Sequence, residues 1–558
     1  MAMATVLMLF VSLLVPSIAD NSFDVRQHFS TVTRYGVVKD ISVNAFVAST
    51  VPDGCSPIHL NLVARHGTRS PTKKRMRELD NFASHLDVLL RDAKNEAQQG
   101  NLSLQKVPAW LWGWQSPWKG KLKGGELMSK GEDEMYHLGI RIRERFLGLF
   151  DEEYHPDIFV IKATQVPRAS ASAVAFGLGL FNGRGSLGPG RHRAFAVTSE
   201  SRASDILLRF HDCCENYKIF MPQGKRKTSP VVFSYRCAAA YELISTSLSD
   251  IRFQNTHYKQ LKVSIPVSYT SILSVKLEST CTVFSYLVQD FRKSQEPSVN
   301  KLKEPILDEV TSALVKRHEL NFTRQDIASL WFLCKQEASL LDITDQACGL
   351  FNPSEVTLLE WMDDLGVFIL KGYGNSLNYR MGVPLLQDVA LSMEQAINAK
   401  EEHHTPGTYE KARLRFAHAE TLIPFSCLLG LFLEESEFKQ IQMKQPLQLP
   451  LKPPNKRNWR GSTVAPFAGN NMLVLYSCPA NNSSKYFVQV LHNEIPVPLP
   501  GCDNTDFCPY EVFKERVVNP HLKHDYNIVC DTKLEQPKPE PVTSKLQQVV
   551  PLVLGEGE

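Results

Sequence analysis

Apolar and polar positions divide most of the chain into parts with different periodicity. Short apolar runs predict a buried strand within residues 57–67, and a strand, a loop and a small-residue helix within residues 157–181. Between residues 201 and 400 the pattern changes to amphipathic stretches, such as 301–322 and 324–341, which predict helices.

Strand-like runs return towards the C-terminal end, at residues 471–478 and 485–499. The segment before them, residues 413–425, predicts a helix-to-loop region. Strands that alternate with helices are typical of an α/β fold. We therefore expect a discontinuous α/β domain at residues 20–200 and 401–533, a mainly α-helical cap insertion at residues 201–400, and a proline-rich flexible tail at residues 534–558.

The first 19 residues form an apolar run with the length of a signal peptide. Small residues at Ser17 and Ala19 favour cleavage after Ala19. No basic residue precedes the run, which leaves an uncleaved membrane anchor as the alternative. No other segment offers about 18 uninterrupted apolar residues. We expect a mature protein that enters the secretory pathway and has no membrane partner.

Cysteine usage agrees with that compartment. The chain has 12 cysteines, an even number, and none forms the paired CxxC spacing of a zinc site. Disulfides are therefore expected. Acceptor sequons for N-glycans occur at Asn101, Asn321, Asn481 and Asn482.

Overall charge excludes several partners. Lys and Arg number 62 against 59 Asp and Glu, so the net charge of +3 exerts no strong pull on nucleic acid or anionic lipid. The basic run at residues 73–77 lacks the interleaved aromatic residues that a nucleic-acid site would use. Any anion chemistry must come from local clustering.

One such cluster surrounds His66. The predicted strand 57–67 ends in Arg65-His66-Gly67, which would place the imidazole at the carboxyl edge of a parallel sheet, where open α/β folds bind ligands. Arg65 and Arg69 can present planar guanidinium groups that match phosphate oxygens bidentately. A neutral histidine can attack phosphorus without losing a proton. These residue types therefore indicate phosphoryl transfer through His66.

The motif R-H-G-x-R-x-P, formed by Arg65, His66, Gly67, Arg69 and Pro71, resembles the signature of the histidine acid phosphatases. The resemblance implies a histidine phosphatase (phosphoglycerate mutase-like) α/β fold in which His66 is the nucleophile. It also implies that Arg65 and Arg69 bind phosphate and that Thr72 and Lys73 contact substrate. Residues 162–173 resemble the family segment that carries a third phosphate-binding arginine, here Arg168.

A second motif refines the resemblance. His418-Ala419-Glu420 matches the H-A-E triplet of the multiple inositol polyphosphate phosphatases, a branch that includes phytases, whereas most of the family has His-Asp here. By resemblance, His418 binds a phosphate oxygen and Glu420 protonates the leaving oxygen. The arginines would supply the positive field that other phosphatases obtain from metal ions, so we expect no cofactor and no metal.

The resemblance also bears on disulfides and destination. It pairs Cys55 with Cys478, and together with spacing it makes Cys502–Cys508 and Cys334–Cys348 plausible. Animal members of the branch end in an endoplasmic-reticulum retention tetrapeptide, whereas this chain ends Gly-Glu-Gly-Glu. We expect a secreted, luminal or vacuolar monomer that acts on inositol phosphates.

Other functions are left as alternatives. A broad-specificity acid phosphatase or a 2,3-bisphosphoglycerate phosphatase fits the same family, and a non-catalytic polyphosphate-binding protein represents a different class. Residues 177–183 do not match the spacing of a dinucleotide-binding loop. The histidine pairs at residues 403–404 and 521–524 lack the helix pattern of a zinc site.

Overall fold

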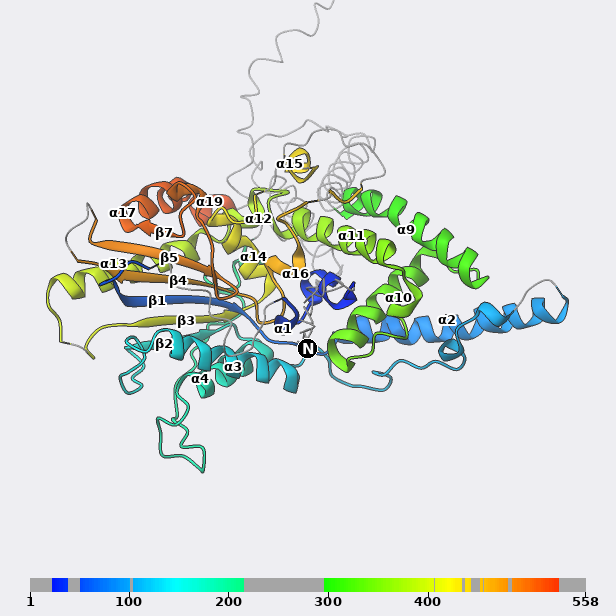
Figure 1. The fold of residues 1–558 in the computed structure, drawn as a ribbon, viewed down its shortest axis with the longest axis horizontal. Coiled ribbons are helices and arrows are strands. Elements are labelled where there is room, and N and C mark those ends of the chain that lie inside the picture. Colours follow the sequence, from blue (N-terminus) through cyan, green and yellow to red (C-terminus); the bar gives the residue numbers. More distant parts are fainter. Residues whose placement is uncertain are drawn as a thin grey trace, which may run out of the picture.

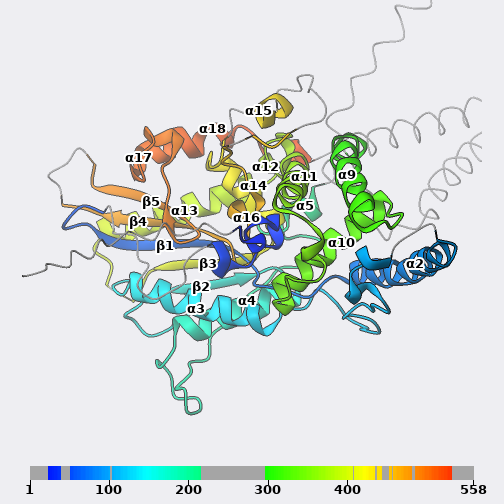
Figure 2. The same ribbon diagram turned by 45° about the vertical axis from the view of Figure 1, so that its right-hand side comes forward.

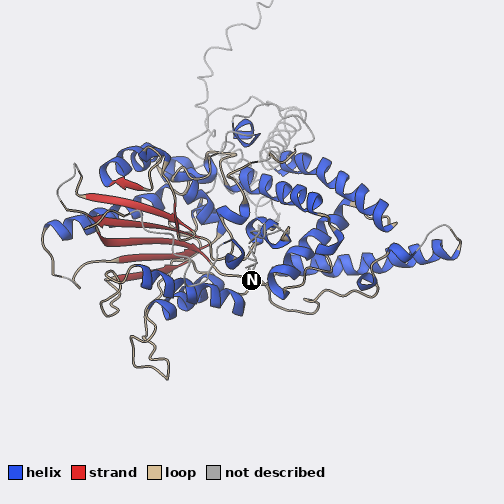
Figure 3. Cartoon of the chain, viewed as in Figure 1, coloured by secondary structure: helices blue, strands red, loops and turns tan. Residues whose placement is uncertain are grey.

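In the computed structural model, a β-sheet occupies one half of the protein and a group of long helices the other (Figures 1 and 3). The structure describes residues 23–38, 51–100, 104–214, 296–405, 407–433, 437–442, 452–454, 456–479 and 484–530. The expected signal peptide, the tail at 534–558 and the sequons at Asn101, Asn481 and Asn482 lie outside these residues. Asn321 is described and exposed.

Seven strands form one mixed sheet, ordered β2-β3-β1-β4-β5-β6, with β7 paired to β5. β1, β2 and β3 are parallel to one another, whereas β4 runs antiparallel to β1 and β5 antiparallel to β4. We expected a parallel sheet around the strand that leads to His66, but β1 has a parallel neighbour, β3, on one side only. The bounds are β1 Ser56–Arg65, β2 Phe159–Ala163, β3 Ala412–Ala417, β4 Asn470–Ser477, β5 Tyr486–His492, β6 Ile495–Pro496 and β7 Phe507–Pro509.

Strand β3 corrects the prediction of a helix-to-loop region at 413–425. Arg413 and Arg415 interrupt its apolar run, so the sequence lacks the pattern of a buried strand. In the fold, the fully buried Arg415 donates hydrogen bonds to Asp388 and to Asn61, with the latter contact at 2.8 Å. Tertiary partners therefore allow an arginine on a central strand, which periodicity alone does not indicate.

Helices cover both faces of the sheet (Figures 1 and 2). α3 (Ser129–Arg145) and α4 (Pro167–Leu180) pack closely against each other on one face, and α13 (Val383–Glu401) and α14 (Ala419–Leu428) contact β1 from the other. Glycines permit the α3–α4 approach, because a Cβ on Gly179 would lie 2.0 Å from the Tyr136 carbonyl oxygen.

The helical half consists of α9 (Glu296–His318), α10 (Arg324–Gln336) and α11 (Pro353–Lys371), together with α2 (Lys73–Gln98). Thr323 and Asn352 each form a capping box that begins a helix. α2 packs on α10 although its residues belong to the expected α/β segment, and α13 contacts the sheet although its residues fall in the expected cap. Each of these two helices therefore contacts an element on the other side of the expected division of the chain.

The described residues also form shorter elements. They are α1 Tyr35–Val38, α5 Phe210–Cys213, α12 Leu377–Arg380, α15 Glu437–Gln442, α16 Gly461–Val464, α17 Tyr510–Phe513, α18 Asn519–Leu522 and α19 Tyr526–Cys530, with single turns at Val25–His28, Ser30–Val32, Leu104–Lys106, Ala109–Leu111, Glu337–Leu341, Cys348–Leu350, Pro500–Cys502 and Lys514–Val518. Among the described residues, no helix has both the length and the apolar character needed to cross a bilayer.

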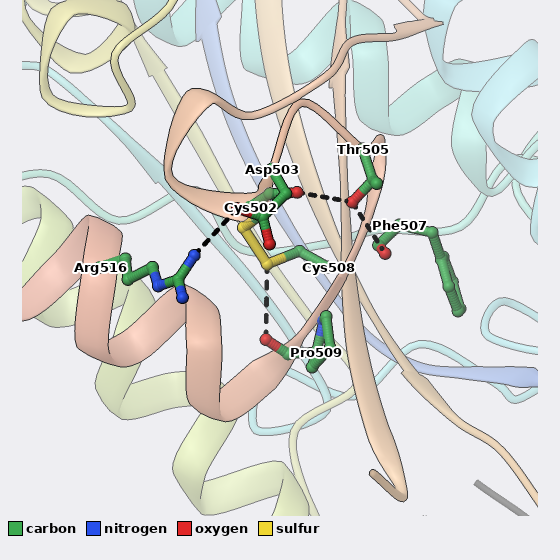
Figure 4. The surroundings of a disulfide bond; sticks show 7 residues. All are labelled: Cys502, Asp503, Thr505, Phe507, Cys508, Pro509 and Arg516. Carbon is green, nitrogen blue, oxygen red and sulfur yellow. Dashed lines mark hydrogen bonds and ion pairs between the residues drawn. A yellow bond between two sulfur atoms is a disulfide. The ribbon is translucent and has the colours of Figure 1, made fainter. Parts of the chain in front are cut away.

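The described part of the chain contains four disulfides. Three join the pairs expected from the sequence, Cys55–Cys478, Cys334–Cys348 and Cys502–Cys508, and the fourth joins Cys214 to Cys530. Figure 4 shows the Cys502–Cys508 bridge beside the ion pair of Arg516 with Asp503, whose atoms lie 3.0 Å apart. Several disulfides in one chain are typical of a secreted or luminal protein.

Candidate active site

His66 lies directly after β1, at the carboxyl end of the strand. Its backbone N–H donates to Ala417 at the end of β3, and its side chain is 2% exposed. Nδ1 lies 2.9 Å from the Gly67 carbonyl oxygen. A carbonyl cannot donate, so the hydrogen is on Nδ1, and the lone pair of Nε2 is available for attack. Burial, followed by the nearby Arg65, holds the pKa of His66 well below its usual value.

The turn after His66 packs tightly against the start of α3. A Cβ on Gly67 would lie 2.3 Å from the Gly131 carbonyl oxygen, and one on Gly131 would lie 2.3 Å from the Thr68 carbonyl oxygen. Glu134 accepts hydrogen bonds of 2.8 Å from both the backbone and the hydroxyl of Thr68. These contacts explain why the motif needs glycine at position 67.

Arg65 and Arg69 each keep a buried guanidinium Nε that has no hydrogen-bond partner among the described residues. Arg65 donates through Nη1 to the carbonyls of Thr31 and Ala465, and it lies 4.4 Å from the centre of the Phe467 ring. Burial and the charge of Arg69 lower the pKa of Arg65 to about 9. The pKa of Arg69 is also lowered by burial. Both groups remain cations at neutral pH.

Arg168 is the second residue of α4, directly after Pro167. Burial, followed by the charge of Arg69, lowers its pKa to about 10. The Nε atoms of Arg65, Arg69 and Arg168 are all buried and have no hydrogen-bond partner among the described residues. Because burying an unpaired donor is costly, three such donors in one cluster point to an absent anionic acceptor.

His418 and Glu420 lie where β3 passes into α14. His418 is the N-cap of the helix, and its ring centre lies 5.4 Å from that of His66. Burial, then the charge of Arg168, holds the pKa of His418 well below its usual value. Glu420 lies in the first turn of α14, and its Oε1 is 3.1 Å from the Nζ of Lys371 on α11.

The expected substrate contacts lie at the rim. Thr72 is the N-cap of α2, and Lys73 is its first residue; both side chains are exposed. The neighbouring Gly125, with a φ of +79°, lies close enough that a Cβ would be 3.8 Å from Thr72 Cγ2 and 3.9 Å from Arg168 Nη1. The fold therefore brings the motif turn, Arg168 and the start of α2 together.

A profile of the histidine phosphatase superfamily (branch 2) matches residues 58–493. The chain belongs to this superfamily. The resemblance noted from the R-H-G-x-R-x-P motif is thereby confirmed.

Named relatives point to the same branch as the H-A-E triplet. Multiple inositol polyphosphate phosphatase 1 of Homo sapiens is 24% identical over 486 residues, which cover 86% of this chain and 83% of the human protein. The protein of the same name from Dictyostelium discoideum is 24% identical over 505 residues, covering 83% of this chain and 66% of that protein.

Among solved structures, the Bifidobacterium longum multiple inositol polyphosphate phosphatase in complex with inositol hexasulfate aligns with a TM-score of 0.53. The alignment covers 89% of this chain and 98% of that chain at 17% sequence identity. The likeness confirms the expected superfamily fold.

Sequence reasoning missed three residues that contact the site. Thr164 and Arg209 both contact His418 Nε2, and Lys371 pairs with Glu420. The one available signal was an arginine inside the run LLRF at 207–210, where a charged side chain must find a partner. Across the described ranges, no cluster of three or more His, Cys, Asp or Glu residues could hold a metal ion.

Proposed function

We propose that this protein is a phosphomonoesterase that removes phosphate from inositol polyphosphates such as phytate through a phosphohistidine intermediate. The observation that carries the proposal is the set of three buried guanidinium Nε atoms, on Arg65, Arg69 and Arg168, that have no hydrogen-bond partner among the described residues and belong to arginines whose charges all act on His66. Such donors suit the oxygens of a transferring phosphoryl group. The names of the relatives support the substrate class.

In the first step, Nε2 of His66 attacks phosphorus, and the bond from phosphorus to the inositol oxygen breaks. An alkoxide is a poor leaving group, so the carboxylic acid of Glu420 delivers a proton to that oxygen. The three arginines and His418 stabilise the charge on the phosphoryl oxygens. Lys371 holds the Glu420 carboxyl at the start of α14.

In the second step, water attacks the phosphorus, and the bond to His66 Nε2 breaks. The Glu420 carboxylate takes the proton from this water, which returns the acid to its starting form and releases inorganic phosphate. The low pKa of His66 keeps the imidazole neutral after release, so the next attack needs no deprotonation.

Substrate phosphates beyond the reacting one would contact the exposed Thr72 and Lys73 at the start of α2. A helix N-terminus followed by lysine attracts an anion, and a small monoester lacks the distal phosphates that would reach it.

We further propose that the protein travels the secretory pathway to the outside or to a vacuole, carries N-glycans and acts as a monomer. The four disulfides support the secretory route.

Incubation of the purified protein with inositol hexakisphosphate and, separately, p-nitrophenyl phosphate tests the function. Chelator is present, and ion-exchange chromatography resolves the products. We expect lower inositol phosphates to accumulate and His66→Ala to stop this. Turnover of p-nitrophenyl phosphate alone would favour a broad acid phosphatase. Binding of inositol hexakisphosphate without phosphate release would favour a polyphosphate-binding protein and overturn the proposal.

A further inference from the structure

Arg209 is a buried arginine that joins the site from outside the two sequence motifs. It lies just before α5 and is 6% exposed. Its Nη1 lies 2.9 Å from Nε2 of His418, and its Nε donates to the Asp212 carboxylate at 2.9 Å. Because a guanidinium has only donors, Nε2 of His418 must accept in this contact and therefore carries no hydrogen.

We propose that Arg209 is a positioning residue that holds His418 as the tautomer with hydrogen on Nδ1, so that His418 can donate this hydrogen to a substrate phosphate oxygen. The inference rests on the proposed function. It gives a role in the reaction to the segment 201–214, which lies outside both sequence motifs.

The second nitrogen of His418 has a competing donor, because Nη2 of Arg168 lies 3.4 Å from Nδ1. A neutral imidazole has one bare nitrogen, and the contact of Arg209 with Nε2 is the shorter of the two at 2.9 Å, so we assign the lone pair to Nε2 and the hydrogen to Nδ1. The hydrogens on Nδ1 and on Nη2 of Arg168 can then both be donated to one phosphate oxygen beside them. Thr164 provides a second donor to Nε2, since its hydroxyl oxygen lies 3.1 Å from that nitrogen.

The segment that carries Arg209 is firmly attached. Asp212 accepts from both Nε and Nη2 of Arg209, and the hydroxyl of Thr421 on α14 donates to the Leu208 carbonyl at 2.7 Å. The disulfide from Cys214 to Cys530 holds the end of α5. A bidentate contact and a covalent link leave Arg209 little freedom to leave His418.

Several charged groups act on His418 from different elements. Arg168 on α4 and Arg209 lower its proton affinity, and so does His211 on α5; Glu420 on α14 opposes them, and His66 lies beyond the ring. Removing Arg209 takes away a guanidinium donor to Nε2. Hydrogen can then move to Nε2, where the Thr164 hydroxyl can accept it, and Nδ1 loses its donor role.

The test compares Arg209→Met and Arg209→Lys with the wild type at pH 7, using kcat/KM for p-nitrophenyl phosphate measured by release of inorganic phosphate. We expect a loss of roughly tenfold to hundredfold in Arg209→Met, since the hydrogen bond from His418 to the phosphate is lost. Arg209→Lys, which keeps the charge and a donor, should retain most of the activity.

Arg202→Met is the matched control, because exposed Arg202 contacts the same Asp212 oxygen at 3.5 Å without contacting His418. Its activity should be unchanged. In a His418→Ala background, Arg209→Met should cost little further activity, because Arg209 acts through His418. If Arg209→Met does not fold, Asp212→Asn, which leaves Arg209 without its anionic anchor, should give a smaller loss that also disappears in the His418→Ala background.

Two results would overturn the inference: a loss in the His418→Ala background as large as in the wild-type background, as plain structural damage would give, or no loss in Arg209→Met. A wild type without any phosphatase activity would instead overturn the proposed function, so the two failures are distinguishable.

Discussion

The rings of His66 and His418 lie edge to face with their centres 5.4 Å apart, but they offer different groups to a bound phosphate. His66 offers a lone pair, and His418 offers a hydrogen. His66 gives its Nδ1 hydrogen to the carbonyl of the next residue, so its free Nε2 offers a lone pair. His418 accepts at Nε2 from Arg209, so its Nδ1 offers a hydrogen. The partner of the far nitrogen thus decides whether a buried imidazole is a nucleophile or a donor.

The largest expected effect separates these two roles. His66→Ala removes the attacking nitrogen and should lower turnover by roughly 10³-fold or more, whereas His418→Ala removes only a donor and should cost about 10²-fold. With labelled inositol hexakisphosphate and an alkaline quench, phosphoenzyme should be trapped from His418→Ala and not from His66→Ala. His137→Ala, on the exposed side of α3, is the control. Phosphoenzyme in His66→Ala would contradict the assignment.

Glu420→Gln should produce the next largest effect, and its size should depend on the leaving group. We expect phosphoenzyme formation from inositol hexakisphosphate to slow by roughly 10² to 10⁴, because the alkoxide needs the proton of the acid. Formation from p-nitrophenyl phosphate, whose leaving group is good, should slow far less. Rapid quenching measures this step separately from dephosphorylation. Equal slowing on the two substrates would assign the acid role to another carboxylate.

The pH dependence of the first step is expected to be weak where ordinary histidines titrate. The folded-state pKa values of His66 and His418 lie below the usual value, so both rings stay neutral as the pH falls through about 6.5. The acid limb of activity on p-nitrophenyl phosphate should therefore lie well below about pH 6.5. Arg65→Met removes a cation beside His66 and should move the acid limb to higher pH. A limb that stays in place would contradict the role of Arg65 in the pKa of His66.

The smallest effect concerns the rim. Lys73→Ala should lower kcat/KM for inositol hexakisphosphate by about threefold to tenfold and leave p-nitrophenyl phosphate turnover unchanged, because only the larger substrate reaches the start of α2. Lys94→Ala, exposed near the other end of the same helix, serves as the control. Equal losses on both substrates would remove Lys73 from distal phosphate binding.

Local sequence was enough to predict much of the fold. Apolar runs predicted β1, β2, β4 and β5, because these strands are largely buried and their own apolar residues account for most of the buried positions. β3 was missed because the residue that makes Arg415 tolerable, Asp388, lies on α13 and is invisible to periodicity. The contact of α2 with α10 could not be predicted for a similar reason, because an amphipathic pattern shows that a helix has a packing partner and does not identify that partner.

The sequence by itself determined the chemistry of the turn at 65–71, because the arginines, the histidine and the glycine that the site uses are neighbours, and the hydrogen on His66 is placed by the adjacent carbonyl of Gly67. Only the tertiary structure decided the chemistry of His418. Its partner Arg209 lies 209 positions earlier in the chain, and the contact forms only when α5 and α14 pack together. A tautomer set by a hydrogen bond between distant segments has no local signal, since neither segment carries the geometry of the pair.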